Sequence, residues 1–126
     1  LYRCYALAGA SLVACCFNTP VMNGETLEST QEAQELAVRG GAIANAVAVI
    51  AAGKAGVEGG VRYSAGSCVI DHKGRILAKA TTEGDELVTA TLDLTAAAAA
   101  RKRMNLAGNR RPELYGLLTA APATKE

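Results

Sequence analysis

Apolar residues in this chain gather in short blocks, and the spacing within each block predicts a helix or a strand. Residues 1–10, LYRCYALAGA, have apolar positions at helical spacing, which favours a short helix ended by Gly9. Residues 11–17, SLVACCF, are apolar almost throughout, which is typical of a strand covered on both faces of a central sheet. Pro20 cannot donate a ladder hydrogen bond, so pairing is expected to stop at the Asn-Thr-Pro that follows.

A second helix is predicted to begin at residues 29–32, because Ser-Thr-Gln-Glu fits a capping box. Its apolar stripe has helical spacing and consists of Ala33, Leu36, Ala37, Gly40 and Ala44. Gly40 and Gly41 each cost a helix about 1 kcal/mol relative to alanine, so another backbone is expected to approach them closely. The apolar run at 46–52, AVAVIAA, predicts a second strand, and a glycine-broken loop follows it.

The middle of the chain predicts a hairpin and a further strand. Residues 64–71 and 75–81 flank Asp-His-Lys-Gly, whose glycine suits the left-handed position of a tight turn. Residues 86–93, ELVTATLD, favour another strand. A helix capped by Thr95 is then expected over 96–104, and the Arg-Lys-Arg at its C-terminal end complements the helix dipole.

This order of elements predicts a layered α+β or α/β fold with helices on one side of a sheet and with more sheet upstream of this chain. At 126 residues there is room for one domain, expected over residues 1–118, with a flexible tail at 119–126. The chain opens at Leu1 inside a predicted helix, which suggests either a trimmed leader or a piece of a longer protein.

Composition narrows the function classes. Half of the residues are apolar and the formal net charge is +1, so the chain has a globular composition without the basic footprint of a nucleic-acid-binding protein. No uninterrupted apolar run is long enough to cross a membrane, and the N-terminus lacks the order of a secretory signal. The expected location is therefore cytoplasmic, where thiols stay reduced.

The cysteine pair of LVACCF is the first candidate for chemistry. Adjacent strand residues point to opposite faces, so Cys15 and Cys16 cannot share one environment. A nucleophilic thiol needs a basic or cationic partner, and none lies nearby in sequence, while the single histidine, His72, falls in a turn. No Cys-x-x-Cys pair suggests zinc. The thiols are therefore predicted to be buried structural residues, and this applies to Cys4, Cys15, Cys16 and Cys68.

Polar residues at strand ends are stronger candidates. Asn18 and Thr19 carry hydrogen-bonding side chains just beyond an apolar strand, where α/β proteins tend to bind ligands. The alternative is that they only terminate the strand. Glu58, in a glycine-flanked loop after the next strand, is a weaker candidate because it is a lone carboxylate.

Three stretches resemble the C-terminal part of the nitrilase superfamily, the carbon–nitrogen hydrolases. The first, YRCYALAGASLVACCFNTP, resembles the helix and strand after the catalytic cysteine, and its Asn-Thr-Pro is typical of the N-carbamoyl-D-amino-acid hydrolase branch. The second, RGGAIANAVAVIAAGKAGVEGG, resembles a helix running into a strand. The third comprises GSCVIDHKGRILAKATTEGDELVTATLDL and RKRMNLAGNRRPELYGLL, which resemble the closing hairpin, strand, helix and tail.

The resemblance implies the C-terminal portion of a four-layer α-β-β-α sandwich that hydrolyses non-peptide C–N bonds, with an N-carbamoyl amino acid as the expected substrate. The family's catalytic Glu, Lys and Cys would all precede Leu1, so no catalytic residue is assigned here. Asn18 and Thr19 map to groups that hold the substrate's carboxylate. The resemblance implies no metal or organic cofactor, and it implies a homo-oligomer. The alternative is a non-catalytic fragment or subunit that contributes only packing and substrate-lining residues.

Overall fold

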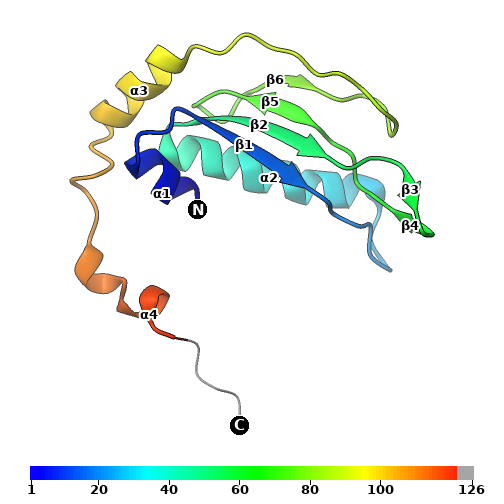
Figure 1. The fold of residues 1–126 in the computed structure, drawn as a ribbon, viewed down its shortest axis with the longest axis horizontal. Coiled ribbons are helices and arrows are strands. Elements are labelled where there is room, and N and C mark those ends of the chain that lie inside the picture. The colour runs from blue at the N-terminus through cyan, green and yellow to red at the C-terminus, as the bar shows by residue number, and fades with distance from the viewer. Residues whose placement is uncertain (122–126) are drawn as a thin grey trace.

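The computed structural model describes residues 1–121 (Figure 1). The helices are α1 (Tyr2–Leu7), α2 (Leu27–Asn45), α3 (Leu94–Arg103) and α4 (Gly116–Thr119), with a 3-10 turn, η1, at Pro112–Leu114. The strands are β1 (Leu12–Phe17), β2 (Ala48–Gly53), β3 (Val57–Glu58), β4 (Val61–Arg62), β5 (Cys68–Ile70) and β6 (Ile76–Lys79). This mixture of helix and strand agrees with the α+β class. Of the predicted tail at 119–126, residues 122–126 lie outside the described residues, and the domain boundary stays a prediction.

Four strands form one sheet in the order β1-β2-β5-β6. β1 and β2 are parallel, with Leu12 opposite Ala48 and Phe17 opposite Gly53, because α2 carries the chain back between them. The β2–β5 and β5–β6 pairs are antiparallel. The carboxyl ends of β1 and β2 therefore lie side by side, and the polar segments that follow these strands start from the same edge (Figure 1).

The core lies between one face of this sheet and the helices α1 and α2, as predicted. Val38 and Ala42 of α2 pack against the inward side chains of the strands, and Ala42 is fully buried. The core cluster consists of Ala6, Val13, Val38, Ala42, Val47, Val49, Ala51, Cys68, Ile70 and Leu106. Aliphatic side chains at alternate strand positions supply most of the sheet's contribution to this cluster.

The opposite face of β1 and β2 is open. Burial alternates along β1, where Val13 is 8% exposed and its neighbour Leu12 is 36% exposed. In β2 the outward Ile50 is 40% exposed. The prediction that the strand at 11–17 is covered on both faces is therefore wrong for this chain, because β1 is an edge strand and its helical cover lies only on the α2 side.

Two helices begin at residues other than those predicted. The cap of α2 is Thr26, whose hydroxyl accepts from the Ser29 amide at 3.0 Å while the Ser29 hydroxyl accepts from the Thr26 amide at 3.1 Å. A serine thus takes the place that the predicted box gave to a carboxylate. α3 is capped by Asp93 rather than Thr95, because a carboxylate satisfies free amides at the positive end of the dipole.

The apolar stripe of α2 faces outward rather than into the core. Leu36 is 61% exposed and Ile43, on the same side, is 54% exposed. The expected close approach at the glycine pair involves a side chain: a Cβ at Gly41 would lie 2.8 Å from the ring of Tyr2, whereas Gly40 has open space around it. The helix instead turns the face that carries the buried Val38 and Ala42 toward the sheet.

The segment at 86–93 belongs to no strand of the described sheets, so the prediction of a further strand there is wrong. Its preference for an extended conformation is satisfied, because it runs along the outside of β6 toward α3 (Figure 1). A ladder needs a neighbouring strand in register, and the tight loop before the segment interrupts that register. In this loop, the Glu86 carboxylate accepts from the backbone amides of Thr81 and Thr82 at 2.8 and 2.9 Å.

The loop at 53–60 contains a small hairpin that the pattern did not predict. β3 and β4 pair with Val57 opposite Arg62 around Gly59 and Gly60, both of positive φ. Two-residue turns of this kind suit a hairpin. Pro20 forms a bridge with Tyr63 next to this hairpin, so the segment after β1 and the segment after β2 are joined.

The predicted turn at 71–74 is confirmed, and its aspartate does more than expected. Gly74 has φ +74° and Asp71 is 7% exposed. Asp71 Oδ1 accepts from the amides of Lys73 and Arg75 at 2.9 and 3.0 Å, and Oδ2 accepts from Arg75 Nε at 2.7 Å. Burial opposes ionisation, but these hydrogen bonds outweigh it and lower the pKa of Asp71.

Candidate functional site

Thr19 is tied to α2 by a network of hydrogen bonds. Gln34 Nε2 donates to Thr19 Oγ1 at 2.7 Å, and Gln34 Oε1 accepts from Ser64 Oγ at 2.7 Å. Ser64 is fully buried, and its amide donates to the Thr19 carbonyl at 3.0 Å. Gln31 Nε2 completes the network by donating to the Ser64 carbonyl at 2.7 Å. The Thr19 side chain therefore holds the strand end against the helix, and the sequence pattern had not indicated its partners.

Asn18 points to the other side. It is exposed and lines a groove of about 820 Å³ together with residues 20–23 and 60–63. Alternation along the strand places Asn18 on the open face with Cys16, whereas Thr19 turns toward α2. The structure thus separates the two predicted site residues: Asn18 is exposed in the groove, whereas the Thr19 side chain is hydrogen-bonded to α2.

An aromatic ring lines the groove together with Asn18 and has a cation over it, and the pattern analysis had not singled out either residue. Lys54 follows β2 directly, and its amide donates to the Phe17 carbonyl at 3.0 Å. Its ammonium lies 4.2 Å from the ring centroid of Tyr63, a groove residue, and it forms an ion pair with Glu58. The weaker carboxylate candidate, Glu58, therefore belongs to the same edge. The available signal was that Gly-Lys ends one apolar strand as Asn-Thr ends its neighbour.

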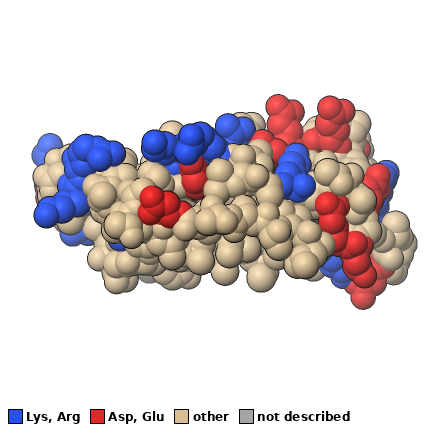
Figure 2. Space-filling view, turned by 90° about the horizontal axis from the view of Figure 1, so that it is seen from above, with Lys and Arg blue, Asp and Glu red and all other residues tan. Residues whose placement is uncertain are grey.

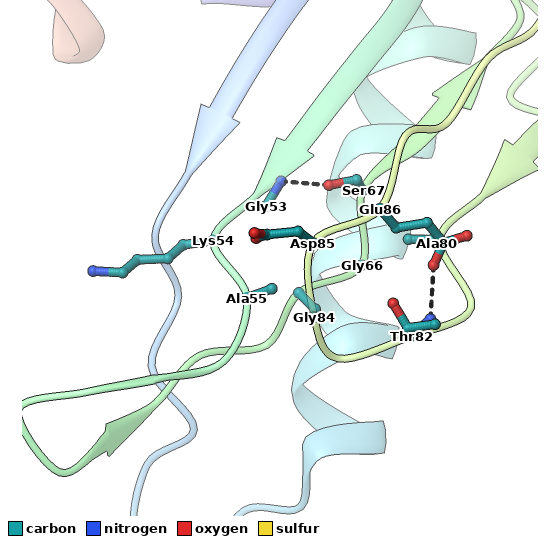
Figure 3. A pocket seen from close by; sticks show the side chains of 11 residues that line it. Gly53, Lys54, Ala55, Gly66, Ser67, Ala80, Thr82, Gly84, Asp85 and Glu86 are labelled. Atoms are coloured by element: carbon teal, nitrogen blue, oxygen red, sulfur yellow. Dashed lines mark hydrogen bonds between the residues drawn. The ribbon is translucent and has the colours of Figure 1, made fainter.

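A second pocket, of about 370 Å³, lies on the β5–β6 side of the same edge (Figure 3). Its polar groups are largely satisfied by one another: the Gly53 amide donates to Ser67 Oγ at 3.0 Å. The backbone amides of Thr81 and Thr82 hold Glu86 and lower the pKa of its carboxyl. The Asp85 side chain points toward the end of β2. Lys54 also lines this pocket, and its side chain extends toward the segment after β1 (Figure 3).

None of the four cysteines lines the groove that contains Asn18. All four are free thiols, and the two neighbours on β1 lie on opposite faces as predicted. Burial raises the pKa of the Cys68 thiol, which disfavours the reactive thiolate. The prediction that all four are buried is right for Cys68 and wrong for Cys4 and Cys16, which are exposed. Cys16 is exposed because it lies on the open face of the sheet.

Charge is distributed unevenly along the molecule. Seen from above, Lys and Arg gather toward the α3 end, and Asp and Glu gather mainly toward the opposite end (Figure 2). Arg101 of α3 has a structural role, because Nη1 donates to the Ala10 carbonyl at 2.6 Å. Over residues 1–121, no group of three or more His, Cys, Asp and Glu is arranged to hold a metal. None of the helices in this part of the chain is long and apolar enough to cross a membrane.

These observations define a mixed α/β unit with helices on one face of its sheet and a polar groove at the carboxyl end of two parallel strands. The family model described as carbon-nitrogen hydrolase matches residues 1–102, so the chain belongs to the carbon–nitrogen hydrolase family.

Solved structures agree with this family. A carbon-nitrogen hydrolase from Helicobacter pylori G27 is 29% identical with TM-score 0.82, over 96% of this chain and 45% of that chain. Saccharomyces cerevisiae Nit3, a member of branch 10 of the nitrilase superfamily, is 26% identical with TM-score 0.65, over 87% and 38%. An amidase from Nesterenkonia sp. AN1 is 22% identical with TM-score 0.62, over 90% and 37%, and this likeness concerns the fold alone. The chain spans less than half of each of these proteins.

Proposed function

We propose that this chain is the C-terminal part of a hydrolase of non-peptide C–N bonds that acts on N-carbamoyl amino acids. Family membership supports the reaction class. The observation that carries the substrate is Asn18, an exposed amide at the end of β1 in a groove that it shares with Tyr63, whose ring has the Lys54 ammonium over it. An amide donor next to a cation suits a carboxylate, which an N-carbamoyl amino acid carries and a simple amide does not.

The proposed chemistry uses a cysteine supplied by the remainder of the protein. Its thiolate attacks the carbamoyl carbon, the amino acid leaves as its amine after protonation, and a carbamoyl thioester remains. Water then cleaves the thioester and returns the proton to the thiolate, and the carbamic acid breaks down to CO₂ and ammonia. The structure of the Nesterenkonia amidase mutant carries a covalent addition at its active-site cysteine, which is consistent with thiol chemistry on this fold.

The open face of the sheet supports a four-layer arrangement. Leu12, Cys16 and Ile50 expose apolar side chains on one continuous surface, as a second sheet would require. A second sheet packed there, with its own helices outside, would complete the α-β-β-α sandwich. We propose that the remainder of the protein supplies this sheet together with the catalytic Glu, Lys and Cys.

The outward stripe of α2 supports the proposed homo-oligomer. Leu36 and Ile43 expose apolar side chains on the side of α2 away from the core, and alanines and glycine flank them. Small residues allow two such helices from two copies to approach closely. Replacing Leu36 by lysine is expected to lower the assembly mass in light scattering, whereas an unchanged mass would contradict this interface.

The alternative proposal is a non-catalytic fragment or subunit that contributes packing and substrate-lining groups only. The specific observation that favours it is the state of Cys68, the thiol whose pKa is influenced by both the Glu35 carboxylate and the Lys79 ammonium. Burial raises the pKa of this thiol, which disfavours the thiolate that thiol catalysis requires.

Sequencing of the coding region upstream of Leu1 separates the two proposals. A hydrolase requires an in-frame continuation that contains Glu, Lys and Cys, and the protein expressed with that continuation should release ammonia from an N-carbamoyl amino acid. Asn18→Ala should then raise KM for that substrate more than for the corresponding carboxamide. A continuation without these residues, or a complete protein that releases no ammonia, would favour the non-catalytic alternative.

A further inference from the structure

Lys54 has a fixed place at the edge of the sheet. Its amide donates to the Phe17 carbonyl at 3.0 Å, and its carbonyl accepts from the Ala65 amide at 2.9 Å. The parallel register pairs Phe17 with Gly53, so continuing it by one residue sets Lys54 beside Asn18. Residues paired in this way lie on the same face of a sheet. The continued register therefore puts the lysine and the asparagine on the same side of this sheet edge.

The side chain of Lys54 is directed by two contacts. The ammonium lies 4.2 Å from the ring centroid of Tyr63, close enough for a cation–π interaction. The second contact is the ion pair with Glu58, four residues later, in which Lys54 is 34% exposed and Glu58 is 68% exposed. The lysine is thus the more sheltered partner, and its carboxylate partner is largely in solvent.

Exposed ion pairs of this kind contribute little to stability, because water solvates both charges and the side chains lose freedom on pairing. Glu58 can therefore be displaced by another carboxylate at small cost. Lys54 remains in place when this happens, because the Tyr63 ring and the backbone ladder do not depend on Glu58. The Lys54 ammonium is therefore kept in position by Tyr63, and its pairing with the Glu58 carboxylate is weak.

We propose that Lys54 is a specificity-determining residue that binds the carboxylate of the substrate together with Asn18, and that Glu58 occupies its ammonium when the site is empty. This inference rests on the proposed function and deepens it by assigning the group that recognises the substrate's charge. No proton is transferred by Lys54 in this role. It selects anionic over neutral substrates by supplying a charge-assisted hydrogen bond.

The test uses the protein expressed with its upstream coding region, and it compares an N-carbamoyl amino acid with the uncharged carboxamide of the same compound. The measured quantity is the ratio of the two kcat/KM values. Lys54→Met should lower this ratio about tenfold or more through KM, since a hydrogen bond to a charged group contributes this much binding. Lys54→Arg should retain most of the ratio. Glu58→Gln should raise the ratio about twofold, because it removes the competing carboxylate.

The opposite directions of the two variants separate recognition from a structural role. If the pair only stabilised the hairpin, Lys54→Met and Glu58→Gln would change the kinetics in the same direction. Lys79→Met is the matched control, because Lys79 pairs with Glu35 at 2.8 Å on the helical side of the sheet with similar exposure, 37%. This control should leave the ratio unchanged.

Two failures are distinguishable. A wild-type protein that hydrolyses the N-carbamoyl amino acid, with a ratio unaffected by Lys54→Met, would overturn the role of Lys54 and leave the proposed function standing. A wild-type protein that hydrolyses only the carboxamide, or neither compound, would overturn the proposed substrate and the inference together.

Discussion

Gln34→Leu is expected to destabilise the protein by about 3 kcal/mol. The substitution keeps the size of the side chain and removes both hydrogen bonds of its amide, which join Thr19 and Ser64 at 2.7 Å each. Loss of the Thr19 contact costs about 1 kcal/mol, and a buried hydroxyl left without a partner costs about 1–3 kcal/mol more. The second cost applies because Ser64 is 0% exposed, so water cannot replace the lost amide.

The assay is urea denaturation followed by circular dichroism, with four proteins in a double-mutant cycle: wild type, Gln34→Leu, Ser64→Ala and the double variant. The double variant has no orphaned hydroxyl, so its total cost should fall below the sum of the single costs by about 1–2 kcal/mol. Glu32→Leu, an exposed position on the same helix, is the matched control and should change stability by less than about 0.5 kcal/mol.

The result that would refute this reasoning is a cost below about 1 kcal/mol for Gln34→Leu, or single costs that add without coupling. Either outcome would mean that the amide is not the bridge between Thr19 and Ser64. The network would then have no part in orienting the end of β1, and the different directions of Thr19 and Asn18 would need another cause.

Three further outcomes are expected. Asp71→Asn should lower the free energy of unfolding by about 2 kcal/mol at neutral pH. Because the pKa of Asp71 in the folded protein lies below the ordinary 3.8, the difference in stability from wild type should persist above pH 3.8 and shrink as the pH falls further. A difference in stability that does not change with pH in denaturation curves would contradict this. Gly53→Ala should lower thermal stability markedly, since its Cβ would lie 2.1 Å from the Ala65 carbonyl oxygen, whereas Gly84→Ala, with open space, should not. Iodoacetamide should label Cys16 in this chain but not in the complete protein, as judged by peptide mass; equal labelling would contradict a sheet packed on the open face.

Local pattern predicted most of the elements, because each depends on residues close in sequence. The strand segments at 12–17 and 48–53, the long helix between them and the turn at 71–74 follow from hydrophobic spacing and from glycine or capping residues. The strand predicted at 86–93 failed for a physical reason: its residues favour an extended chain, but a strand also needs a neighbour in register, which short-range pattern does not specify. The β3–β4 hairpin was missed because each of its strands is only two residues long.

The sequence by itself determined that polar residues follow two apolar strands, and the family resemblance indicated a carbon–nitrogen hydrolase. Only the tertiary structure decided which of those polar residues face the groove and which face α2. The alternation of a pleated strand turns Thr19 toward α2 and Asn18 toward the open groove. The parallel register brings Lys54, 36 positions later in the sequence, to the same sheet edge as Asn18. The two cysteines of the adjacent pair also lie on opposite faces of β1, Cys15 on the core side and Cys16 on the open side. Which side chains share a face depends on register and on what covers the sheet, and both are set by contacts between distant parts of the chain.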